Sequence, residues 1–312
     1  MNLKNWMTNL NENVRNVPVI FLSIPGSHDS MTYTINESSK SAPDAQLFVK
    51  ILVKIFGNIV KRFVLRWSIT QNSTVTEQLN FGIRYFDLRL ATNDTDSNFY
   101  ITHALFGAQI DNILVEINNF LTENKEEIVI LDFQHFYGFT ADDHLRLMNL
   151  VEIIFCEKLC PLPWDINTVT LSWMRDKSYQ VIAIYRNISA EQRTSFWPSL
   201  RYPTPWPHTT SVEELIPFLQ SCLSKRYQNK GLVTQCVLTP DNLFVAKHIF
   251  SSLKSTCAPD CRRAVLPWLN MQHPGINGVN VVIADFIDFN DGEFSKTVIA
   301  LNDKLSTTYN KV

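Results

Sequence analysis

EIVILDFQHF, residues 127–136, has an unbroken apolar run at 128–131 after Glu127 and turns polar at Asp132 and Gln134. A short β-branched and aromatic run of this kind is typical of a buried strand. It stands between two amphipathic helix candidates, NILVEINNFLTEN (112–124) and DDHLRLMNLVEIIFCEKL (142–159), and a second strand candidate, YQVIAIYR (179–186), follows. Strands that alternate with helices in this way predict a parallel sheet covered by helices.

The same pattern extends in both directions along the chain. Five further segments have the composition of buried strands: VPVIFLSIPG (17–26), IRYFDLRLA (83–91), FYITHAL (99–105), GLVTQCVLTP (231–240) and VNVVIADF (279–286). This many strands and helices favour an α/β fold, a (β/α) TIM-type barrel with irregular details. No linker rich in Pro, Gly or Ser divides the chain, so we predict a single domain over residues 1–312 with its core at about 15–300.

Two shorter features bear on the connections between these elements. Thr74 and Glu77 have the spacing of a capping box and predict a short helix before the 83–91 strand. Residues 195–210 contain four prolines and two tryptophans, which predict an ordered loop. Trp197 and Trp206 in this loop could lie on the rim, stack on the ring of a ligand, or simply pack in the core.

Charge and cysteine content exclude several classes of protein. The chain carries 28 Lys and Arg against 30 Asp and Glu, so no excess positive charge attracts nucleic acid. Its six cysteines lack the Cys-x-x-Cys pairs of common zinc sites, and we expect ordinary thiols. MNLKNWMTNLNENVRNV (1–17) lacks the apolar core of a secretory signal, and no segment is apolar enough to span a membrane. We therefore expect a cytoplasmic protein.

Polar residues recur where the predicted strands end. They are His28 and Asp29, Asp87 and Arg89, His103, Asp132 and Gln134, Arg186, and Asp285. The carboxyl ends of parallel barrel strands meet at one face, where barrel enzymes build their active sites. Each residue alone could be structural, but their joint placement indicates a site. Pro25 and Gly26 are expected to end the first strand so that His28 faces this barrel mouth.

The residue types in this set favour phosphoryl transfer without a metal. One imidazole can remove a proton from a nucleophile while the other protonates a leaving group. An arginine between them offers a planar, fixed charge that suits phosphate oxygens. A carboxylate bonded to an imidazole, from Asp29 or Asp285, would set its tautomer.

Five segments, taken in order, resemble the phosphatidylinositol-specific phospholipase C X-domain family. They are IPGSHDS (24–30), TEQLNFGIRYFDLRLA (76–91), YITHALFG (100–107), EIVILDFQHFY (127–137) and VVIADF (281–286). The chain is most similar to the eukaryotic stand-alone X-domain proteins, and the resemblance runs from residue 5 to about residue 300.

The resemblance implies a role for each residue of the set. His28 matches the general base that deprotonates the inositol 2-hydroxyl, and His103 matches the general acid that protonates the leaving diacylglycerol oxygen. Arg89 matches the arginine that replaces calcium in the metal-independent branch, so no cofactor is expected. The products would be diacylglycerol and an inositol phosphate, formed through a cyclic intermediate.

The remaining residues match the family less uniformly. Asp29 matches an aspartate beside the base, and Asp285 matches the late aspartate that orients His28. Arg186 and Asp132 fall where substrate-binding residues are expected. Gln134 departs from the pattern, since both better-known branches carry a charged residue there, and this puts headgroup contacts and catalytic efficiency in doubt.

Peripheral contact with a membrane is one of two interpretations of residues 46–66, QLFVKILVKIFGNIVKRFVLR. Apolar residues recur there at helical spacing, with five basic residues among them, as in a helix that lies in a membrane interface. The alternative is that the apolar stripe packs on the barrel.

Two other functions remain open. The first is a catalytically weak inositol-lipid binder, suggested by Gln134. The second is another barrel phosphodiesterase such as a glycerophosphodiester hydrolase, which would need a metal held by carboxylates.

Overall fold

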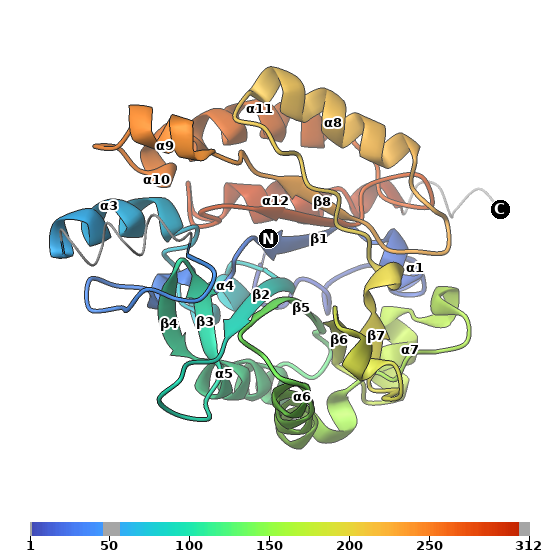
Figure 1. The fold of residues 1–312 in the computed structure, drawn as a ribbon. Coiled ribbons are helices and arrows are strands. Elements are labelled where there is room, and N and C mark those ends of the chain that lie inside the picture. The colour runs from blue at the N-terminus through green and yellow to red at the C-terminus, as the bar shows by residue number, and fades with distance from the viewer. Residues whose placement is uncertain (1, 46–56, 306–312) are drawn as a thin grey trace.

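In the computed structural model, which describes residues 2–45 and 57–305, nine strands form one curled sheet with helices around its outside (Figure 1). The strands are β1 (Ile24–Ser27), β2 (Tyr85–Ala91), β3 (Tyr100–His103), β4 (Leu105–Gln109), β5 (Val129–Tyr137), β6 (Val181–Tyr185), β7 (Phe196–Pro198), β8 (Val233–Cys236) and β9 (Val281–Ala284). The α-helices are α1 (Glu12–Arg15), α3 (Asn58–Ser68), α4 (Val75–Asn80), α5 (Ile110–Glu123), α6 (Ala141–Phe155), α7 (Leu171–Asp176), α8 (Val212–Ser224), α9 (Asn242–Lys247), α10 (Leu253–Thr256), α11 (Ala258–Met271) and α12 (Glu293–Ala300).

Seven of the strands run parallel in the order β7-β6-β5-β2-β1-β9-β8. The sheet curls into a barrel, and the hydrogen-bonded path of the described strands ends at β7 on one side and β8 on the other. Helices α5 and α6 cover the β2–β5 side, and α8, α11 and α12 cover the β8–β9 side (Figure 1). The predicted irregular (β/α) barrel is confirmed.

Side-chain alternation along the strands builds two apolar cores. Every second residue along the strands, such as Tyr85, Ile130 and Ile283, belongs to one cluster. The residues next to them in sequence, such as Phe86 and Leu131, belong to the other. Because successive strand residues point to opposite faces, the first cluster fills the barrel and the second packs under the helices. The interior positions that follow Tyr85 and Ile130 along their strands become polar, and this change opens a site at the carboxyl ends.

Residues before β2 close the other end of the barrel. Trp6 is buried there and donates from Nε1 to the carbonyl of Gly82 at 2.9 Å. Arg84 and Glu127 form an ion pair at 2.8 Å in which both side chains are fully buried. This end is therefore packed shut, whereas the carboxyl end carries the predicted site residues.

The first predicted strand is shorter than expected, and one part of the prediction is wrong. Residues 19–21 form a 3₁₀ turn, and β1 contains Pro25 and Gly26 instead of ending at them. Pro25 is tolerated because pairing with β2 begins only at Gly26, opposite Tyr85. A Cβ on Gly26 would approach Ile283 Cγ2 to 2.8 Å, so the barrel needs glycine at this position.

Two further predictions on the connections are corrected. The 99–105 segment is not a parallel barrel strand, because β3 and β4 form an antiparallel hairpin beside β2. Residues 195–210 are not all loop, since Phe196–Pro198 is strand β7 and Ser199–Arg201 is a 3₁₀ turn. Trp197 is fully buried and donates to the carbonyl of Cys160, which identifies it as a core residue.

Other local predictions hold. The 112–124 and 142–159 helices are present as α5 and α6, the latter ending at Phe155 with a 3₁₀ turn after it. The capping box between Thr74 and Glu77 is formed at the start of α4. All six cysteines are free.

The predicted membrane segment is described only in part. Residues 46–56 lie outside the described residues, while 58–68 form α3. Trp67 is buried and packs edge-on to Phe244, so the end of α3 joins the core. Among the described residues, none of the helices combines the length and apolar character needed to cross a bilayer.

Candidate active site

His28 follows β1 directly and is held on both its backbone and its ring. Its N–H donates to the carbonyl of Ala284 on β9, and its carbonyl accepts from Gln71 Nε2 at 3.0 Å. Its ring Nδ1 lies 2.7 Å from Asp285 Oδ1. A carboxylate can only accept, so Nδ1 carries the proton and Nε2 keeps its lone pair in the neutral ring.

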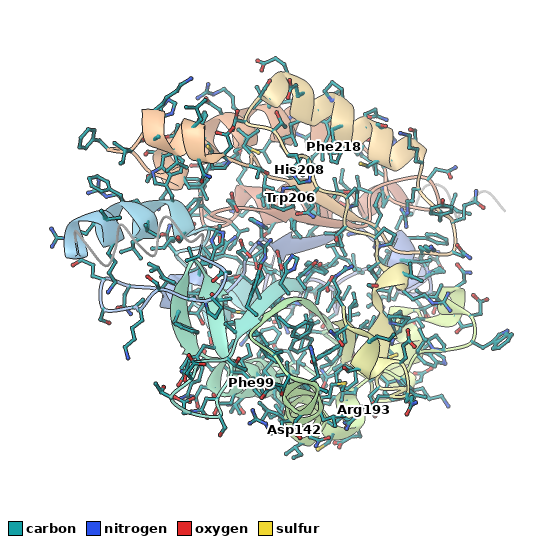
Figure 2. All side chains as sticks on the ribbon, in the orientation of Figure 1. Phe99, Asp142, Arg193, Trp206, His208 and Phe218 are labelled. Atoms are coloured by element: carbon teal, nitrogen blue, oxygen red, sulfur yellow. The ribbon has the colours of Figure 1, made fainter. Side chains whose placement is uncertain are left out.

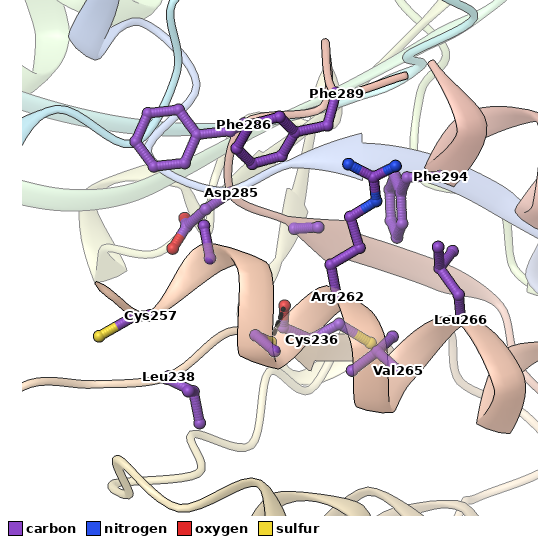
Figure 3. A pocket seen from close by; sticks show the side chains of 13 residues that line it. Cys236, Leu238, Cys257, Arg262, Val265, Leu266, Asp285, Phe286, Phe289 and Phe294 are labelled. Atoms are coloured by element: carbon purple, nitrogen blue, oxygen red, sulfur yellow. Dashed lines mark hydrogen bonds between the residues drawn. The ribbon is translucent and has the colours of Figure 1, made fainter. Parts of the chain in front are cut away.

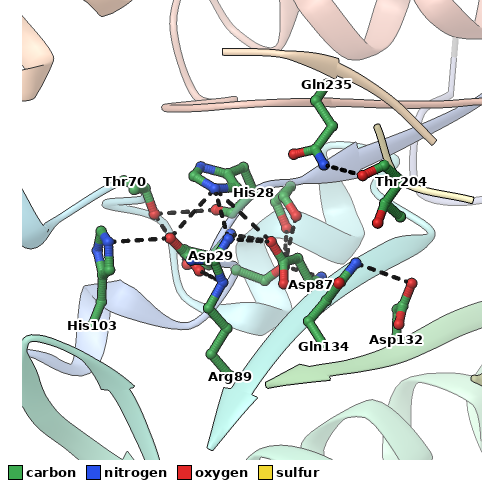
Figure 4. A network of polar contacts seen from close by, with 12 residues as sticks. His28, Asp29, Thr70, Asp87, Arg89, His103, Asp132, Gln134, Thr204 and Gln235 are labelled. Atoms are coloured by element: carbon green, nitrogen blue, oxygen red, sulfur yellow. Dashed lines mark hydrogen bonds and ion pairs between the residues drawn. The ribbon is translucent and has the colours of Figure 1, made fainter. Parts of the chain in front are cut away.

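The other ring nitrogen of His28 faces Arg89. Arg89 Nη2 lies 3.1 Å from His28 Nε2 and can only donate to it. Burial alone would lower the pKa of His28, but the charges of Asp29 and Asp285 outweigh burial and Arg89, and the net pKa is raised. Neutral His28 is therefore a base of increased strength, and its Nε2 lies among the side chains of Arg89, Asp29 and Asp87 (Figure 4).

Arg89, late in β2, is surrounded by carboxylates. Its Nε pairs with Asp29 Oδ1, and its Nη2 lies 3.3 Å from Asp87 Oδ2. Burial would lower the pKa of Arg89, but these two charges raise it above its usual value. The guanidinium stays charged at any working pH.

Asp29 lies at the centre of the cluster. Its Oδ2 is 3.4 Å from His28 Nε2 and 3.5 Å from His103 Nε2. Burial opposes its charge, yet Arg89, His28 and His103 outweigh burial and lower the pKa of the carboxyl to about 2. Its backbone has φ 40°, a conformation that Asp adopts more readily than most residues, and its carbonyl accepts from Thr70 Oγ1.

His103 reaches the cluster from the β3–β4 hairpin. Its Nδ1 donates to the carbonyl of Ser68, the last residue of α3, at 2.6 Å. That bond leaves Nε2 facing Asp29, so His103 can hold a proton at Nε2 only as an imidazolium. The two histidines thus turn their Nε2 atoms to the same carboxylate oxygen from different elements.

A second polar group lies deeper along β5 and β6. Arg186 binds Asp132 through two nitrogens, at 2.8 and 2.6 Å, and Tyr85 donates to Asp132 at 2.6 Å. Gln134 Nε2 donates to both Tyr85 and Asp132 at 3.2 Å. Burial raises the pKa of Asp132, and the charge of Arg186 partly offsets it. All three predicted substrate-binding residues therefore share one network.

Trp206 lies over His28 and Arg89. Its ring centroid is 5.2 Å from that of His28, and Arg89 Cζ lies 5.8 Å from its ring. Figure 2 shows Trp206 beside His208 on the loop after β7. Of the three possibilities left open for Trp206, the geometry favours a ring that bounds the ligand space.

Asp285 also borders a small cavity behind the site, lined by Cys236, Cys257 and Phe286 among others (Figure 3). Burial raises the pKa of Cys257 to about 12, so the thiol stays protonated. We interpret the residues that line this cavity as packing that supports Asp285.

Thr70 and Gln71 contribute to the site although no sequence pattern pointed to them. Thr70 Oγ1 donates to the carbonyls of His28 and Asp29, and Gln71 Nε2 donates to those of His28 and Ala284. The signal that could have found them is weak, because they lie in a loop, ITQNST, without periodicity.

The cluster does not fit a bound cation. Ligand atoms of His28, Asp29 and Asp87 lie within 4.8 Å of one another, which is close enough for a metal. However, Arg89 pairs with both carboxylates and donates to the imidazole, so its positive charge already faces the atoms that would bind the metal.

Three comparisons place this geometry among known proteins. No family model matches the chain. PI-PLC X domain-containing protein 3 of Homo sapiens is 39% identical over 97% of this chain and 94% of its own length. PI-PLC X domain-containing protein 2 of Mus musculus is 41% identical over 96% and 88%. Human PI-PLC X domain-containing protein 1 is 34% identical over 97% and 93%.

Solved structures share the fold. The phosphatidylinositol-specific phospholipase C of Listeria monocytogenes superposes with a TM-score of 0.65 at 18% identity, covering 96% of this chain and 99% of its own. That of Staphylococcus aureus gives 0.66 at 16% identity, covering 97% of each chain. At this identity the likeness shows the barrel fold alone, whereas the identity to the curated relatives shows that the chain belongs to the PI-PLC X domain-containing protein family.

Proposed function

We propose that the chain is a phosphodiesterase that cleaves phosphatidylinositol to diacylglycerol and an inositol phosphate. The observation that carries the proposal is the pair of imidazoles whose Nε2 atoms contact the same Asp29 oxygen, with Arg89 beside them. A phosphodiester at this point would have a base on one side, an acid on the other, and a fixed cation against its oxygens. The names of the relatives and of the bacterial structures support this reaction class.

The first half of the reaction uses the two histidines in opposite protonation states. Neutral His28 takes the proton of the inositol 2-hydroxyl at Nε2, and the hydroxyl oxygen attacks the phosphorus. Asp285 stabilises the imidazolium that forms. The bond to the diacylglycerol oxygen breaks, and that oxygen receives the Nε2 proton of His103. A cyclic inositol phosphate remains.

The second half reverses the roles. His103, now neutral, takes a proton from water, whose oxygen attacks the cyclic phosphorus. His28 returns its proton to the inositol 2-oxygen as the ring opens, so the histidines recover their starting states. The release of an inositol monophosphate completes the cycle.

Arg89 supplies the charge that a metal would supply elsewhere. Its guanidinium is fixed by Asp29 and Asp87 before substrate binds, so it faces the developing charge on the phosphorane oxygens without reorganising. We therefore propose calcium-independent catalysis.

The headgroup end of the site favours a neutral inositol ring. Arg186 is already neutralised by Asp132, and Gln134 carries no charge. A phosphomonoester on the ring would find no unpaired arginine in this group of residues. Trp206 would bound the ring from above.

The membrane contact remains a proposal centred on residues 46–66. In the described part, α3 lies against a strongly exposed aromatic residue, since Phe63 packs edge-on to Phe250 and Arg66 donates to the carbonyl of Phe250. Phe250 is 83% exposed. Basic and apolar side chains therefore share one edge of the molecule, as peripheral contact with an anionic bilayer requires.

A headgroup binder with little turnover is the second candidate. Gln134 favours it, because an amide bound to Asp132 and Tyr85 offers the ring less than a charged group would. Vesicle binding without product, at any calcium concentration, would identify this function.

The proposed reaction is tested with purified protein and vesicles of phosphatidylinositol or its phosphorylated forms, with and without chelator, with products identified by mass. We expect diacylglycerol and cyclic or open inositol phosphate from phosphatidylinositol, in both conditions. His28→Ala and His103→Ala should each abolish turnover and keep the folded circular dichroism spectrum. Full turnover by both variants would rule out the mechanism.

A further inference from the structure

Strand β5 contains a bulge at the site that changes which side chains face the mouth. Asp87 lies opposite Asp132, but the register then shifts, and Arg89 lies opposite His135. Strict alternation would place His135 on the helix-facing side, away from Asp132. The extra residue at the bulge is Gln134, which still points inward because its amide binds Asp132. Two consecutive residues therefore face the mouth.

The ring of His135 lies in this position beside the ring of Tyr137. In the part of the chain that the structure describes, its ring makes no hydrogen bond, and it is exposed at the rim. The ring of Tyr137, two residues on, lies beside it at 6.0 Å and 32°. This imidazole is exposed to solvent and lies opposite Arg89 on the neighbouring strand. It is therefore available to hydrogen-bond a ligand.

The charges around His135 define what it can bind. The charges that act on its pKa are those of Arg89 and Asp87 from β2, Asp29 after β1, and Arg186 after β6. Partial burial and the charge of Arg89 lower the pKa of His135, so its ring is neutral at pH 7 and carries one N–H. Arg89 and His135 are opposite each other on neighbouring strands, so an anion bound to Arg89 would lie within reach of that N–H.

We infer that His135 is a further phosphate-contacting residue, which donates to an oxygen of the phosphate group held by Arg89. The inference rests on the proposed function and deepens it. The inference also gives the bulge at Gln134 a role. Because Gln134 is the extra residue, the next residue, His135, turns toward the mouth and brings a donor to the phosphate in addition to Arg89. His135 would touch the phosphate and not the inositol ring, which lies toward Asp132 and Arg186.

The inference has a protonation signature. An anion beside an imidazole favours its charged form, so bound phosphate raises the pKa of His135. Binding therefore takes up a proton, and the affinity for phosphate increases as the pH falls through the pKa of the free residue, which lies below 6.5.

The test compares two soluble probes, myo-inositol 1-phosphate and myo-inositol, by titration calorimetry at pH 7. His135→Ala should bind the inositol phosphate about tenfold more weakly, the loss of one good hydrogen bond to a charged group, and bind myo-inositol as the wild type does. His273→Ala is the matched control, because His273 is also exposed but precedes β9 at the opposite end of the barrel. It should change neither affinity.

A second readout follows the Hε1 resonance of His135 by NMR. Its pKa should rise on addition of inositol phosphate and stay constant with myo-inositol. Equal losses for both probes would assign His135 to the ring, and unchanged affinities, or no binding of inositol phosphate by the wild type, would overturn the inference. Because both probes are products or fragments, the result does not depend on turnover: a wild type that binds inositol phosphate through His135 without cleaving lipid would refute only the proposed reaction.

Discussion

An arginine that faces carboxylates stands at each end of strand β2, fully buried at Arg84 and partly buried at Arg89, and the two differ in how completely the charges around them are satisfied. Before the strand, Arg84 donates from all three nitrogens: to Glu127, to the carbonyls of Leu79 and Ile83, and to that of Lys4. Glu127 in turn accepts from the amide and hydroxyl of Thr8. Every donor of this guanidinium has a partner within the chain.

Arg89, five residues later, lies among carboxylates whose oxygens are only partly hydrogen-bonded. Within the described part of the chain, both oxygens of Asp29 and Oδ1 of Asp87 are buried without a hydrogen bond. The Asp29 oxygens nevertheless lie within ion-pair distance of Arg89 and the two histidines. Buried polar groups are nearly always bonded, so such exceptions mark places where a ligand completes the set. From this difference we propose that Arg84 holds the fold and Arg89 serves the chemistry, in keeping with the two ends of a barrel.

Breaking the satisfied pair should have the largest effect on stability. Glu127→Gln removes the negative partner and leaves the Arg84 charge buried, which should cost about 3–5 kcal/mol of unfolding free energy in urea denaturation. The matched control is Glu126→Gln, whose partner Arg15 lies 3.3 Å away at the surface; it should cost less than about 1 kcal/mol. Similar losses in the two variants would contradict the contrast between buried and exposed pairs.

The pH profile tests the electrostatics at the other end. His28 must be neutral to act as a base and its pKa is raised, so the acid limb of kcat/KM should have its midpoint above 6.5 and fall about tenfold per pH unit below it. The same raised pKa contributes stability that is present below 6.5 and is lost as the pH rises through the folded value.

Asp285→Asn sharpens this result, because it removes one of the charges that raise the pKa of His28. The acid limb should move to lower pH in this variant. A limb that stays in place would show that another group titrates.

Much of this arrangement could be predicted from the sequence, because the strands are short apolar runs and their polar ends are visible as such. His28, Arg89, His103 and Asp285 were found in this way, and the structure brings all four together.

What the sequence did not show depends on long-range packing. The hairpin that brings in His103 runs antiparallel, so its convergence on the mouth does not follow from the parallel-barrel rule. The bulge that turns His135 inward depends on pairing with β2, which no local pattern records. Arg84 gave no signal either, since its five donors find partners far apart in sequence, such as Lys4 and Glu127.

The smallest expected effect on stability is at an incompletely bonded carboxylate. Asp87→Asn keeps the shape of the side chain and removes a charge whose Oδ1 has no hydrogen bond. The free energy of unfolding should change by less than about 1 kcal/mol, because a charge that is poorly satisfied contributes little net stability. Thermal and urea denaturation provide the measurement, and a loss comparable to that of Glu127→Gln would remove the distinction between the two ends.

The most direct test is to exchange each arginine for lysine, Arg84→Lys and Arg89→Lys, and to measure both urea unfolding and phosphatidylinositol cleavage per folded molecule. Lysine keeps the charge but loses the planar fork. We predict that Arg84→Lys loses about 3 kcal/mol or more of stability with turnover preserved, and that Arg89→Lys loses about 10²- to 10³-fold in kcat with stability within about 1 kcal/mol of the wild type. The opposite pattern, or full turnover by Arg89→Lys, would contradict the division of roles between the two ends of β2.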